Sequence, residues 1–398
     1  MKKPSSTFHL PSSNFHLPSS KSPRVAIVHD WLVGGGAEKV VLELHRMFPD
    51  APIYTSYCTD EWRQKLDNKV ITGYLQNWPF SALRKFLPVL RQRWFSKLNL
   101  YGFDLVISSS GNGEAKFVLS KMPSSNSHLL SSKPVHICYC HTPTHFYWRH
   151  YDDYLRNPSF RPKWLVHLGL KLLVAPLRQR DFAAAQKVDH FIANSSHIQA
   201  DIKQFYGKDA TVIHPPVDVD RFSQIPSSIF HLPKRSGFVT VGRQVPYKRI
   251  DVIIQACNQL RLPLTVIGNG PEHNDLVAMA GPTITFKTDV ADDQMPSELA
   301  AAEAFIFAAF EDFGVAPVEA LAAGTPVIAY KAGGALDYVI EGQTGLFFED
   351  QTSKSLVKAL QNFHPKKFDH STVTKHAKTF SIENFHKQLS DILRKISS

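Results

Sequence analysis

Two glutamates that lie eight positions apart, Glu311 and Glu319, are the residues of this chain with the clearest potential for chemistry. A helical pattern that begins near Val315 places Glu311 on a loop and Glu319 about one turn inside a helix. The backbone amides of residues 314–316 would then lack acceptors within the helix and would be available to oxygen atoms of a ligand. A carboxylate at position 319 would accept hydrogen bonds from vicinal hydroxyls, such as those of a ribose. The glycine, proline and small residues of EDFGVAPVEALAAGTPV (311–327) favour this site over two solvated helix charges.

Two basic residues flank a turn in the stretch GRQVPYKRID (242–251), which follows a predicted strand over 237–242. Arg243 and Lys248 would both lie at the carboxyl edge of a sheet, where ligands of open α/β sheets bind. A pair of cations suits a diphosphate, whose negative charge needs stabilisation when it departs as a leaving group. By itself the stretch equally fits a solvated basic loop.

Three consecutive glycines, Gly34, Gly35 and Gly36, lie between a predicted strand at 25–30 and the helix that follows them. A turn of this kind lets the backbone approach a phosphate, which then lies at the N-terminus of the helix. The dinucleotide-binding motif would need a further glycine where this chain has Lys39, so that motif is excluded. Taken alone, the three glycines fit a tight turn without a ligand equally well.

The elements that would position these residues repeat one pattern, in which short apolar strands alternate with helices. The pattern occurs twice, and the segment HPPVDVDRF (214–222) between the two series has neither helical nor strand periodicity. We therefore predict an α/β protein with two Rossmann-like, doubly wound domains that face each other across a cleft. The expected strands are 25–30, 51–57, 104–110, 136–140, 190–196, 237–242, 264–269, 304–309 and 326–330, and the expected helices are 37–48, 163–187, 247–260, 315–323, 352–362 and 381–396.

The domain limits follow from this pattern and from a Ser/Pro-rich string, FHLPSS, that recurs with variations. Because the recurrences are short and irregularly spaced, we interpret them as low-complexity insertions at surface connections. The last helical stretch has no strand after it and is expected to pack back on the N-terminal domain. The predicted units are a disordered leader (1–23), an N-terminal domain (24–216) with an insertion at 122–134, a C-terminal domain (217–380) with an insertion at 225–234, and a crossover helix (381–398).

The formal net charge of +10 predicts an anionic partner, such as an anionic lipid or a phosphorylated substrate. We expect no nucleic-acid partner, because no recognised nucleic-acid-binding motif accompanies the charge. The sequence has no apolar run long enough to span a membrane and no signal-peptide pattern, so we expect a cytoplasmic protein. Cys138 and Cys140 have no further ligands at a metal-binding spacing, and buried free thiols are the better interpretation.

Basic residues alternate with apolar ones in RKFLPVLRQRW (84–94), and the stretch 163–180 repeats this pattern. Basic amphipathic segments bind anionic membrane surfaces, which would place the protein peripherally on the inner face of the cell membrane. The alternative is that these charges lie on the solvent side of helices that pack on the core.

Taken together, the motifs resemble those of the family 4 glycosyltransferases, which have the GT-B fold. The stretches GRQVPYKRID, GNGP, EDFGVAPVEALAAGTPVIA and GGALDYVIEGQTG are similar to the donor domain of that family. The stretches VAIVHDWLVGGGAEKVV and YCHTPTHFYW are similar to the acceptor domain of its bacterial mannosyltransferase-like members. The resemblance covers roughly residues 24–395 in order. It departs at 145–149, where relatives often have Arg-aromatic-aromatic-Trp-Asp and this chain has HFYWR, and at 286–290, which lacks the usual glycine.

The resemblance implies a role for each matched residue. Arg243 and Lys248 would hold the donor diphosphate, Glu311 would contact the transferred sugar, and Glu319 would bind the nucleotide ribose. His141 matches the family histidine that contacts the donor sugar near the reaction centre, and a structural histidine at a strand end is the alternative. The implied catalytic set is His141, Glu311, Arg243 and Lys248, and the implied donor-binding set is Gly35, Gly36, Phe313, Gly314, Val315 and Glu319.

The resemblance also implies the reaction, in which a hexose, with mannose favoured, moves from a GDP- or UDP-hexose to a glycan or lipid-linked acceptor with retention of configuration. Cell-surface polysaccharide synthesis is the expected setting. A retaining hydrolase would need two carboxyl groups about 5 Å apart, and no second carboxylate of the acceptor domain fills this role.

Front-face attack is implied instead, with the leaving diphosphate as base and cations in place of a metal, so we expect no metal and no cofactor. The alternatives are an inactive sugar- or nucleotide-binding scaffold protein and another GT-B enzyme, such as a nucleotide-sugar epimerase or a sugar phosphorylase. A phosphorylase of this fold would need a lysine-bound pyridoxal phosphate, for which we find no motif.

Overall fold

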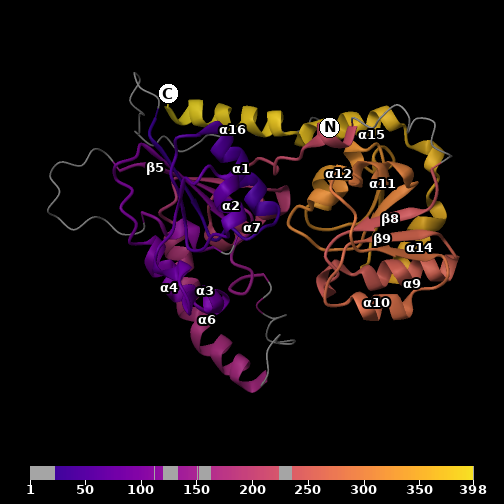
Figure 1. Cartoon of the computed structure of the whole chain (residues 1–398), viewed down its shortest axis with the longest axis horizontal. Helices are drawn as coiled ribbons and strands as arrows, with labels where there is room; N and C mark the ends of the chain where they lie inside the picture. The colour runs from indigo at the N-terminus through magenta and orange to yellow at the C-terminus, as the bar shows by residue number, and fades with distance from the viewer. Residues whose placement is uncertain are drawn as a thin grey trace, which may run out of the picture.

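The computed structural model describes residues 23–111, 113–119, 133–149, 151, 163–223 and 235–397 of the chain. The predicted leader and the two predicted insertions lie outside these residues, apart from residues 23, 133 and 134. Two parallel sheets, one in each half of the sequence, form two α/β units that lie side by side (Figure 1).

The first sheet has seven parallel strands in the order β3-β2-β1-β4-β5-β6-β7. Its central strands are buried on both faces; β1 is apolar at every position except His29, whereas β4 is apolar at its start and ends in three buried serines. Along β1, Val25 and Ile27 pack in the same core as α1 and α16, while Ala26 and Val28 face the core that contains α4. The strands are β1 (Val25–His29), β2 (Ile53–Thr55), β3 (Val70–Ile71), β4 (Leu105–Ser110), β5 (Val135–Cys140), β6 (His190–Ala193) and β7 (Ala210–Val212).

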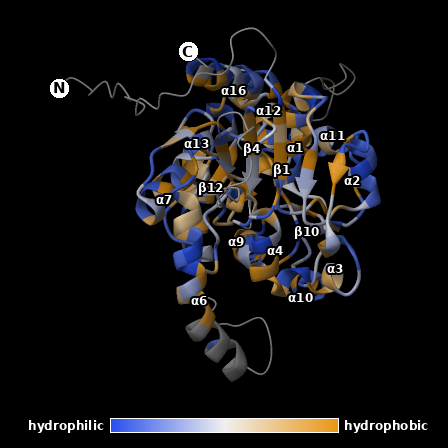
Figure 2. Ribbon diagram, turned by 90° about the vertical axis from the view of Figure 1, so that its left-hand side faces the viewer, coloured by the Kyte–Doolittle hydropathy of each residue, from blue (hydrophilic) through white to orange (hydrophobic). Residues whose placement is uncertain are grey.

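Helices cover both faces of this sheet. The structure has α1 (Gly36–Met47), α2 (Asp60–Lys65), α3 (Phe80–Leu83), α4 (Pro88–Phe95), α6 (Lys163–Ala185) and α7 (Ser196–Tyr206), with 3-10 turns η1 (Tyr74–Gln76), η2 (Arg84–Phe86) and η3 (Ala115–Phe117). Local signals set some of their limits: the hydroxyl of Ser195 caps α7, and Gly207 ends it in the left-handed conformation at a φ of 67°. The outer helix α2 is hydrophilic along most of its length and buries only Trp62 (Figure 2).

The second sheet has six parallel strands in the order β10-β9-β8-β11-β12-β13. Phe305 and Phe307 of β11 face the core built with α8, α11, α12 and α15, and Ile306 faces the core built with α9 and α14. The strands are β8 (Phe238–Val241), β9 (Leu264–Ile267), β10 (Ile284–Lys287), β11 (Ala304–Phe307), β12 (Val327–Tyr330) and β13 (Gly345–Phe348). The helices are α8 (Val219–Ser223), α9 (Ile250–Leu260), α10 (His273–Met279), α11 (Met295–Ala301), α12 (Val315–Ala322), α13 (Ala335–Tyr338), α14 (Ser353–Asn362) and α15 (His370–Ala377), with η5 (Pro246–Lys248), η6 (Pro365–Lys367) and η7 (Lys378–Phe380).

The final helix, α16 (Ile382–Ser397), leaves the second unit and lies along the first (Figure 1). Phe385 and Leu389 are buried in the core of the first sheet, and His386 Nε2 lies 3.1 Å from a carboxylate oxygen of Glu43 in α1. The amide of Val217 donates to the carbonyl of Phe380 at 3.0 Å, so the connection between the units lies against the start of α16. The predicted fold class, with its C-terminal helix packing back on the N-terminal domain, is confirmed.

Three further details bear on the predictions from sequence, and the first of them is a correction. The segment 214–222 was expected to lack regular structure, but α8 begins inside it, because Val219 and Phe222 bury their side chains against the second core. The four cysteines are buried free thiols, as predicted. Within the described part of the chain, no helix combines the length and apolarity needed to span a membrane.

Candidate active site

Loops that follow strands of both sheets contact each other where the two units meet. A Cβ atom added to Gly36, at the start of α1, would lie 3.8 Å from a methyl group of Val315, at the start of α12. Nearby, His145 Nε2 lies 3.5 Å from Asp312 Oδ2, which joins the loop after β5 to the loop after β11. The N-termini of α1 and α12 therefore approach each other, as the predicted phosphate site requires.

The loop that begins with Glu311 is packed directly on the backbone of a glycine pair. The amide of Gly334 donates to the carbonyl of Glu311 at 2.9 Å. A Cβ atom on Gly333 would lie 2.3 Å from that carbonyl oxygen, and one on Gly334 would lie 2.3 Å from the Cα of Phe313. Glycine is therefore required at both positions. The close packing of this pair on the backbone of Glu311 and Phe313 fixes the position of the loop that follows β11.

Lys248 and Glu311 form an ion pair between Nζ and Oε1, and both side chains are mostly buried. Lys248 is brought to this place by η5 and by a left-handed backbone at the next residue, Arg249, with a φ of 51°. Its Nζ also lies 5.6 Å from the ring centre of Phe307. Arg243, the other predicted phosphate ligand, is exposed, and its guanidinium makes no ion pair or hydrogen bond with a described residue. The structure thus joins one predicted cation to a predicted carboxylate and leaves the other exposed to solvent.

The N-terminus of α12 has the geometry that the sequence predicts. Gly314 is the N-cap residue at a φ of 91°, and no side chain caps the helix. The first amides of α12 therefore have no acceptor within the helix and no capping side chain. Glu319 is the fifth residue of α12, and its Oε1 lies 3.2 Å from the Nζ of Lys39 in α1.

The glycine turn before α1 is held by Glu38, which the sequence analysis did not single out. The carboxylate of Glu38 accepts hydrogen bonds from the amides of Val33 and Gly34, at 3.3 and 3.1 Å. Gly34 has a φ of 111°, and a Cβ atom on Gly35 would lie only 3.0 Å from a carboxylate oxygen of Glu38. The side chain of Glu38 is buried, and its two hydrogen bonds fix the path of the backbone through the turn.

His141 follows β5 and is held by two neighbours from other strands. Its Nε2 lies 2.8 Å from the Ser109 hydroxyl, and its carbonyl accepts a hydrogen bond of 2.9 Å from the side-chain amide of Asn194. The pKa of His141 is lowered to about 3, mainly by burial and also by nearby His29. The imidazole is therefore neutral near pH 7, and it can contact a sugar hydroxyl but carries no charge to offer a phosphate.

A second carboxylate beside Glu311, Asp312, was missed by the sequence analysis. The pKa of Asp312 is raised to about 7, mainly by burial and also by the carboxylates of Asp201 and Glu311, while a hydrogen bond from Thr142 opposes the shift. Because Asp312 also faces His145, a carboxyl group that titrates near neutral pH joins the two units beside the predicted reaction centre.

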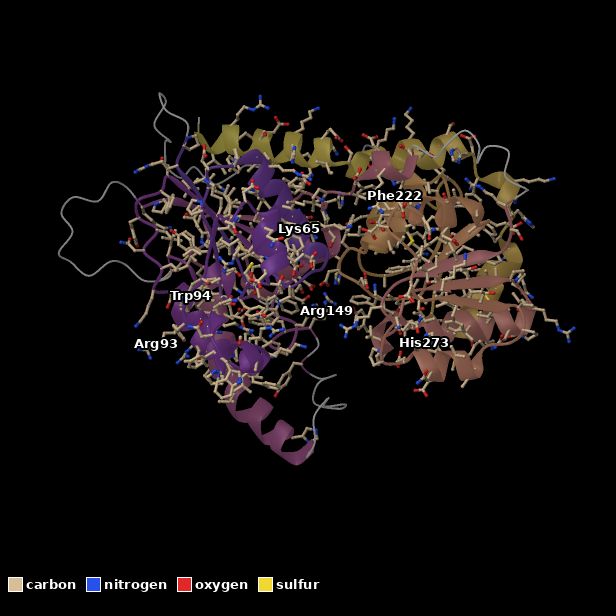
Figure 3. All side chains as sticks on the ribbon, in the orientation of Figure 1. Lys65, Arg93, Trp94, Arg149, Phe222 and His273 are labelled. Carbon is tan, nitrogen blue, oxygen red and sulfur yellow. The ribbon has the colours of Figure 1, made fainter. Side chains whose placement is uncertain are left out.

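The two charged departures from the relatives, at positions 145 and 149, both face carboxylates. His145 pairs with Asp312, as described above, and Arg149 Nε donates to Asp201 Oδ2 at 2.9 Å. Arg149 lies on the side of the first unit that faces the second (Figure 3). Both residues therefore have acidic partners: His145 pairs across the two units, and Arg149 pairs within the first unit with Asp201 of α7.

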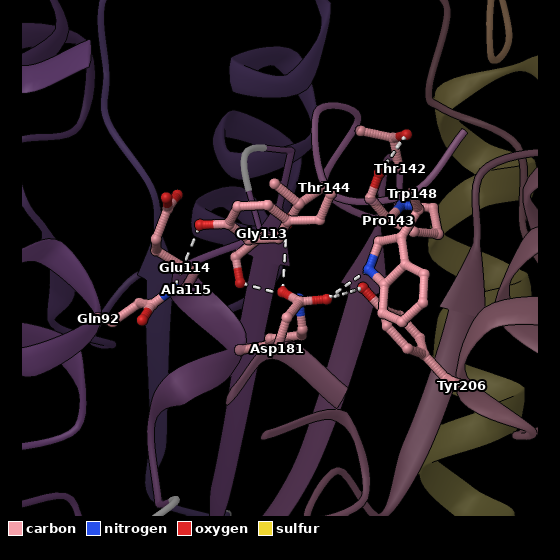
Figure 4. Close-up of polar contacts among 12 residues, drawn as sticks. Gln92, Gly113, Glu114, Ala115, Thr142, Pro143, Thr144, Trp148, Asp181 and Tyr206 are labelled. Atoms are coloured by element: carbon pink, nitrogen blue, oxygen red, sulfur yellow. Dashed lines mark hydrogen bonds and ion pairs between the residues drawn. The ribbon is translucent and has the colours of Figure 1, made fainter. Parts of the chain in front are cut away.

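Beneath the loop that carries His141 lies a buried polar network centred on Asp181 of α6 (Figure 4). Asp181 is fully buried and accepts from Lys116 Nζ, from the Thr144 hydroxyl at 3.2 Å, from Trp148 Nε1 at 2.8 Å and from the Tyr206 hydroxyl at 2.8 Å. The network fixes the segment after His141 to α6 and α7. No sequence motif marks Asp181, because its four partners come from three separate parts of the chain.

The predicted residues thus lie on loops that follow strands of the two sheets and at the starts of α1 and α12, with Glu319 inside α12, and their proposed roles stay predictions. Among the described residues, no cluster of three or more His, Cys, Asp or Glu side chains could hold a metal ion. Two parallel α/β sheets joined in this way, with a helix crossing back from the second to the first, define the GT-B class of proteins.

Comparison with known families narrows this class. Residues 34–221 match the family described as Glycosyltransferase Family 4, and residues 224–378 match the one described as Glycosyl transferases group 1. The chain belongs to the family 4 glycosyltransferases of the GT-B fold, as its motifs predict.

Several characterised proteins are similar to this chain. A GDP-mannose-dependent alpha-(1-6)-phosphatidylinositol monomannoside mannosyltransferase of Mycolicibacterium smegmatis is 30% identical over 166 residues, which cover 35% of this chain and 44% of that protein. A D-inositol 3-phosphate glycosyltransferase of Streptomyces scabiei is 27% identical over 205 residues, which cover 44% of this chain and 46% of that protein. The chain spans about half the length of the curated relatives that it matches. The structure of Anabaena HepE in complex with UDP-glucose superposes with a TM-score of 0.66 at 18% identity and covers 94% of this chain and 100% of that one, which shows the shared fold.

Proposed function

We propose that this protein is a retaining hexosyltransferase that moves mannose from a nucleotide-sugar donor to a glycan or lipid-linked acceptor, in the synthesis of cell-surface polysaccharide. One observation carries the proposal: carboxylates, cations and uncapped helix amides meet on loops from both sheets. Glu311 with Lys248, and Glu319 with Lys39, provide acceptors for hydroxyls beside donors for phosphates. A nucleotide-sugar presents these two kinds of group in one molecule.

Each part of the donor has a proposed partner. The ribose diol would bind Glu319, and the diphosphate would lie between Arg243, Lys248 and the amides of Phe313 to Val315. The glycine turn at Gly35 and Gly36 would approach the diphosphate from the first unit. Uncapped helix amides and cations stabilise the charge that develops on a leaving diphosphate, which is the main demand of glycosyl transfer from such a donor.

Retention without a covalent intermediate agrees with how the first unit uses its carboxylates. Asp30 accepts hydrogen bonds from the amides of Gly111 and Ala115, Asp181 is enclosed in its network, and Glu114 pairs with buried Arg91 at 2.8 Å. Each of these carboxylates holds the protein's own groups, so none is poised as a nucleophile. We therefore propose front-face attack by the acceptor hydroxyl, with the leaving diphosphate as the base. His141, neutral and buried, would contact the transferred sugar.

Mannose as the sugar and a lipid-linked molecule as the acceptor are supported by the relatives, whose names include a GDP-mannose-dependent enzyme that acts on a phosphatidylinositol mannoside. A UDP-hexose is the other candidate donor, because HepE binds UDP-glucose. Transfer from radiolabelled GDP-mannose and UDP-glucose to a lipid extract would distinguish the two. Nuclear magnetic resonance of the purified product would give the anomeric configuration, and an inverted product would contradict the proposed mechanism.

Nucleotide binding is the first test of the site. We expect GDP or UDP, at 100 times its dissociation constant, to stabilise the protein by about 2.7 kcal/mol, which raises the melting temperature by about 2–4 °C. The change Glu319→Ala should abolish this shift. Glu298→Ala is the matched control, because Glu298 also lies in a helix of the second unit and pairs with a lysine, Lys287, at 2.6 Å. A wild-type protein that responds to neither nucleotide would contradict the proposed function.

An exposed basic and apolar surface at α3 and α4 supports attachment to the inner face of the cell membrane. Residues 68–103 contain six lysines and arginines, of which all but the buried Arg91 are at least partly exposed, and no acidic residue. Trp78 is 82% exposed and Phe86 is 56% exposed in this stretch, and Arg93 lies at the outer edge of the first unit (Figure 3). Exposed aromatic and cationic side chains together favour the interface of an anionic bilayer.

Vesicle sedimentation would test this attachment. We expect binding to vesicles that contain phosphatidylglycerol at low salt, and weaker binding after Trp78→Ala or after the paired change Lys85→Glu and Arg93→Glu. Tyr247→Ala serves as the control, because Tyr247 is an exposed aromatic residue of the other unit. Equal binding of all variants, or no binding of the wild type to these vesicles, would contradict the proposal.

A further inference from the structure

Both glutamates of the proposed donor site are already held by lysines, and one of these lysines comes from the opposite unit. Lys248 pairs with Glu311 within the second unit. Lys39, 280 positions away in sequence, reaches across from α1 to Glu319 at 3.2 Å. Its side chain is 51% exposed, whereas that of Glu319 is 16% exposed. An ion pair with a half-exposed lysine contributes little to stability, so a ligand can exchange it at low cost.

Binding of the donor would disturb both pairs at once. If a sugar hydroxyl takes Glu311 and the ribose diol takes Glu319, each carboxylate gives up contact with its lysine. The only anionic group that the ligand brings is its diphosphate. The resemblance assigns Lys248 to the diphosphate and gives Lys39 no role, yet each of the two lysines pairs with a glutamate of the proposed donor site.

The distance from Glu319 to the expected phosphate position is within reach of a lysine side chain. Glu319 lies four residues after Val315, which is about 6 Å along the axis of α12. Val315 is also the residue that faces Gly36, where the two helix N-termini approach. A lysine has a flexible four-carbon stem, so Lys39 could turn from Glu319 toward this point without movement of α1.

We propose that Lys39 is a donor-binding residue, which Glu319 holds while the site is empty and which turns to the diphosphate when the ribose occupies Glu319. This inference rests on the proposed function. It assigns the first unit a charged contact with the donor, in addition to the backbone of its glycine turn. It also gives the two units a shared ligand, because one diphosphate would then bind cations from both.

Calorimetric titration of the full chain with GDP, UDP, guanosine and uridine would test the proposal. We expect Lys39→Met to weaken binding of the favoured diphosphate about tenfold, the usual effect of losing one charge-assisted contact. Affinity for the matching uncharged nucleoside should stay the same or rise, because Glu319 is then unoccupied. Lys39→Arg should restore most of the affinity for the diphosphate. Lys203→Met is the control, since Lys203 is also exposed and ion-paired but lies in the second half of α7.

Salt dependence provides a second measurement. Binding of the diphosphate should weaken less with added NaCl in Lys39→Met than in the wild type, because one charged contact is missing. If Lys39→Met binds the diphosphate as tightly as the wild type or more tightly, the proposal is wrong, and Lys39 only spans the two units. If the wild type binds neither GDP nor UDP, the proposed function fails and this inference fails with it.

Discussion

Replacement of Asp181 by asparagine tests whether the buried network beneath the His141 loop contributes as much as its geometry indicates. Asp181 is fully buried, and its partner Lys116 is 2% exposed, so the change leaves an ammonium group buried without its counter-ion. Loss of one partner of a buried ion pair costs about 3–5 kcal/mol. The new amide group also presents hydrogen-bond donors where Trp148 and Tyr206 already donate. We therefore expect a destabilisation of about 4 kcal/mol.

The tryptophan distribution makes this loss measurable in one unit alone. All six tryptophans of the chain lie before residue 165, so their fluorescence reports unfolding of the first unit. With a urea m-value of about 2 kcal/mol/M, a loss of about 4 kcal/mol lowers the urea midpoint by about 2 M. Trp148, whose indole bonds to Asp181, should also change its emission in the folded state.

Two further variants decide the cause of any loss. Asp391→Asn removes an acidic partner from an exposed pair with Arg394 in α16, and we expect a change of about 0–1 kcal/mol. The double variant Lys116→Met with Asp181→Asn should recover part of the loss, because no buried charge is then left unpaired. A midpoint shift below about 0.5 M for Asp181→Asn, with an unchanged m-value, would refute the reasoning.

The remaining predictions concern the glycine pair, pH and metal. Gly334→Ala should abolish the nucleotide-induced thermal shift, because its Cβ would collide with the backbone of Phe313, whereas Gly342→Ala meets no neighbour and should cost only about 1 kcal/mol in urea unfolding. Burial lowers the pKa of His136 to about 4, so the stability that its neutral form provides is lost as pH falls below 6.5. We expect the free energy of unfolding, measured in urea at both pH values, to fall by about 2 kcal/mol between pH 8 and pH 5. The pKa of Asp312 is raised to about 7, so its protonated form stabilises the fold at low pH and this stability is lost as pH rises. The wild type should therefore lose about 2 kcal/mol of unfolding free energy relative to Asp312→Asn between pH 5 and pH 8, as measured by urea unfolding at both pH values. Turnover should persist in EDTA, and a lasting loss that magnesium reverses would contradict the proposed role of the cations.

Apolar periodicity in the sequence was sufficient to predict the interior of both sheets. All nine predicted strands correspond to strands that have a neighbour on each side, and the four that were not predicted are the edge strands β3, β7, β10 and β13. The physical reason is burial. A central parallel strand is covered on both faces and is therefore rich in apolar residues. The edge strands are short and partly exposed, as in ITFK (284–287).

Local sequence also predicted the parts of the site that are built within a few residues. The glycine turn before α1, the uncapped start of α12 and the place of Glu319 inside that helix depend on short-range geometry, which residue type and spacing determine. Family resemblance added His141 and favoured a diphosphate-binding role for Arg243 and Lys248 over a solvated basic loop. These predictions concern positions along one loop or helix, for which the backbone alone sets the arrangement.

Only the tertiary structure decided which charged groups contact each other and which ionisable groups have shifted pKa values. Lys39 and Glu319 become partners because two units, each folded around its own sheet, place two helix N-termini together. Asp312 and His141 owe their shifted pKa values to burial, and burial depends on neighbours that are distant in sequence. Asp181 accepts from four donors in three segments that are far apart in sequence, and no local pattern predicts that they meet. Electrostatic interactions depend on distance in space and on solvent exposure, and neither can be read from spacing along the chain.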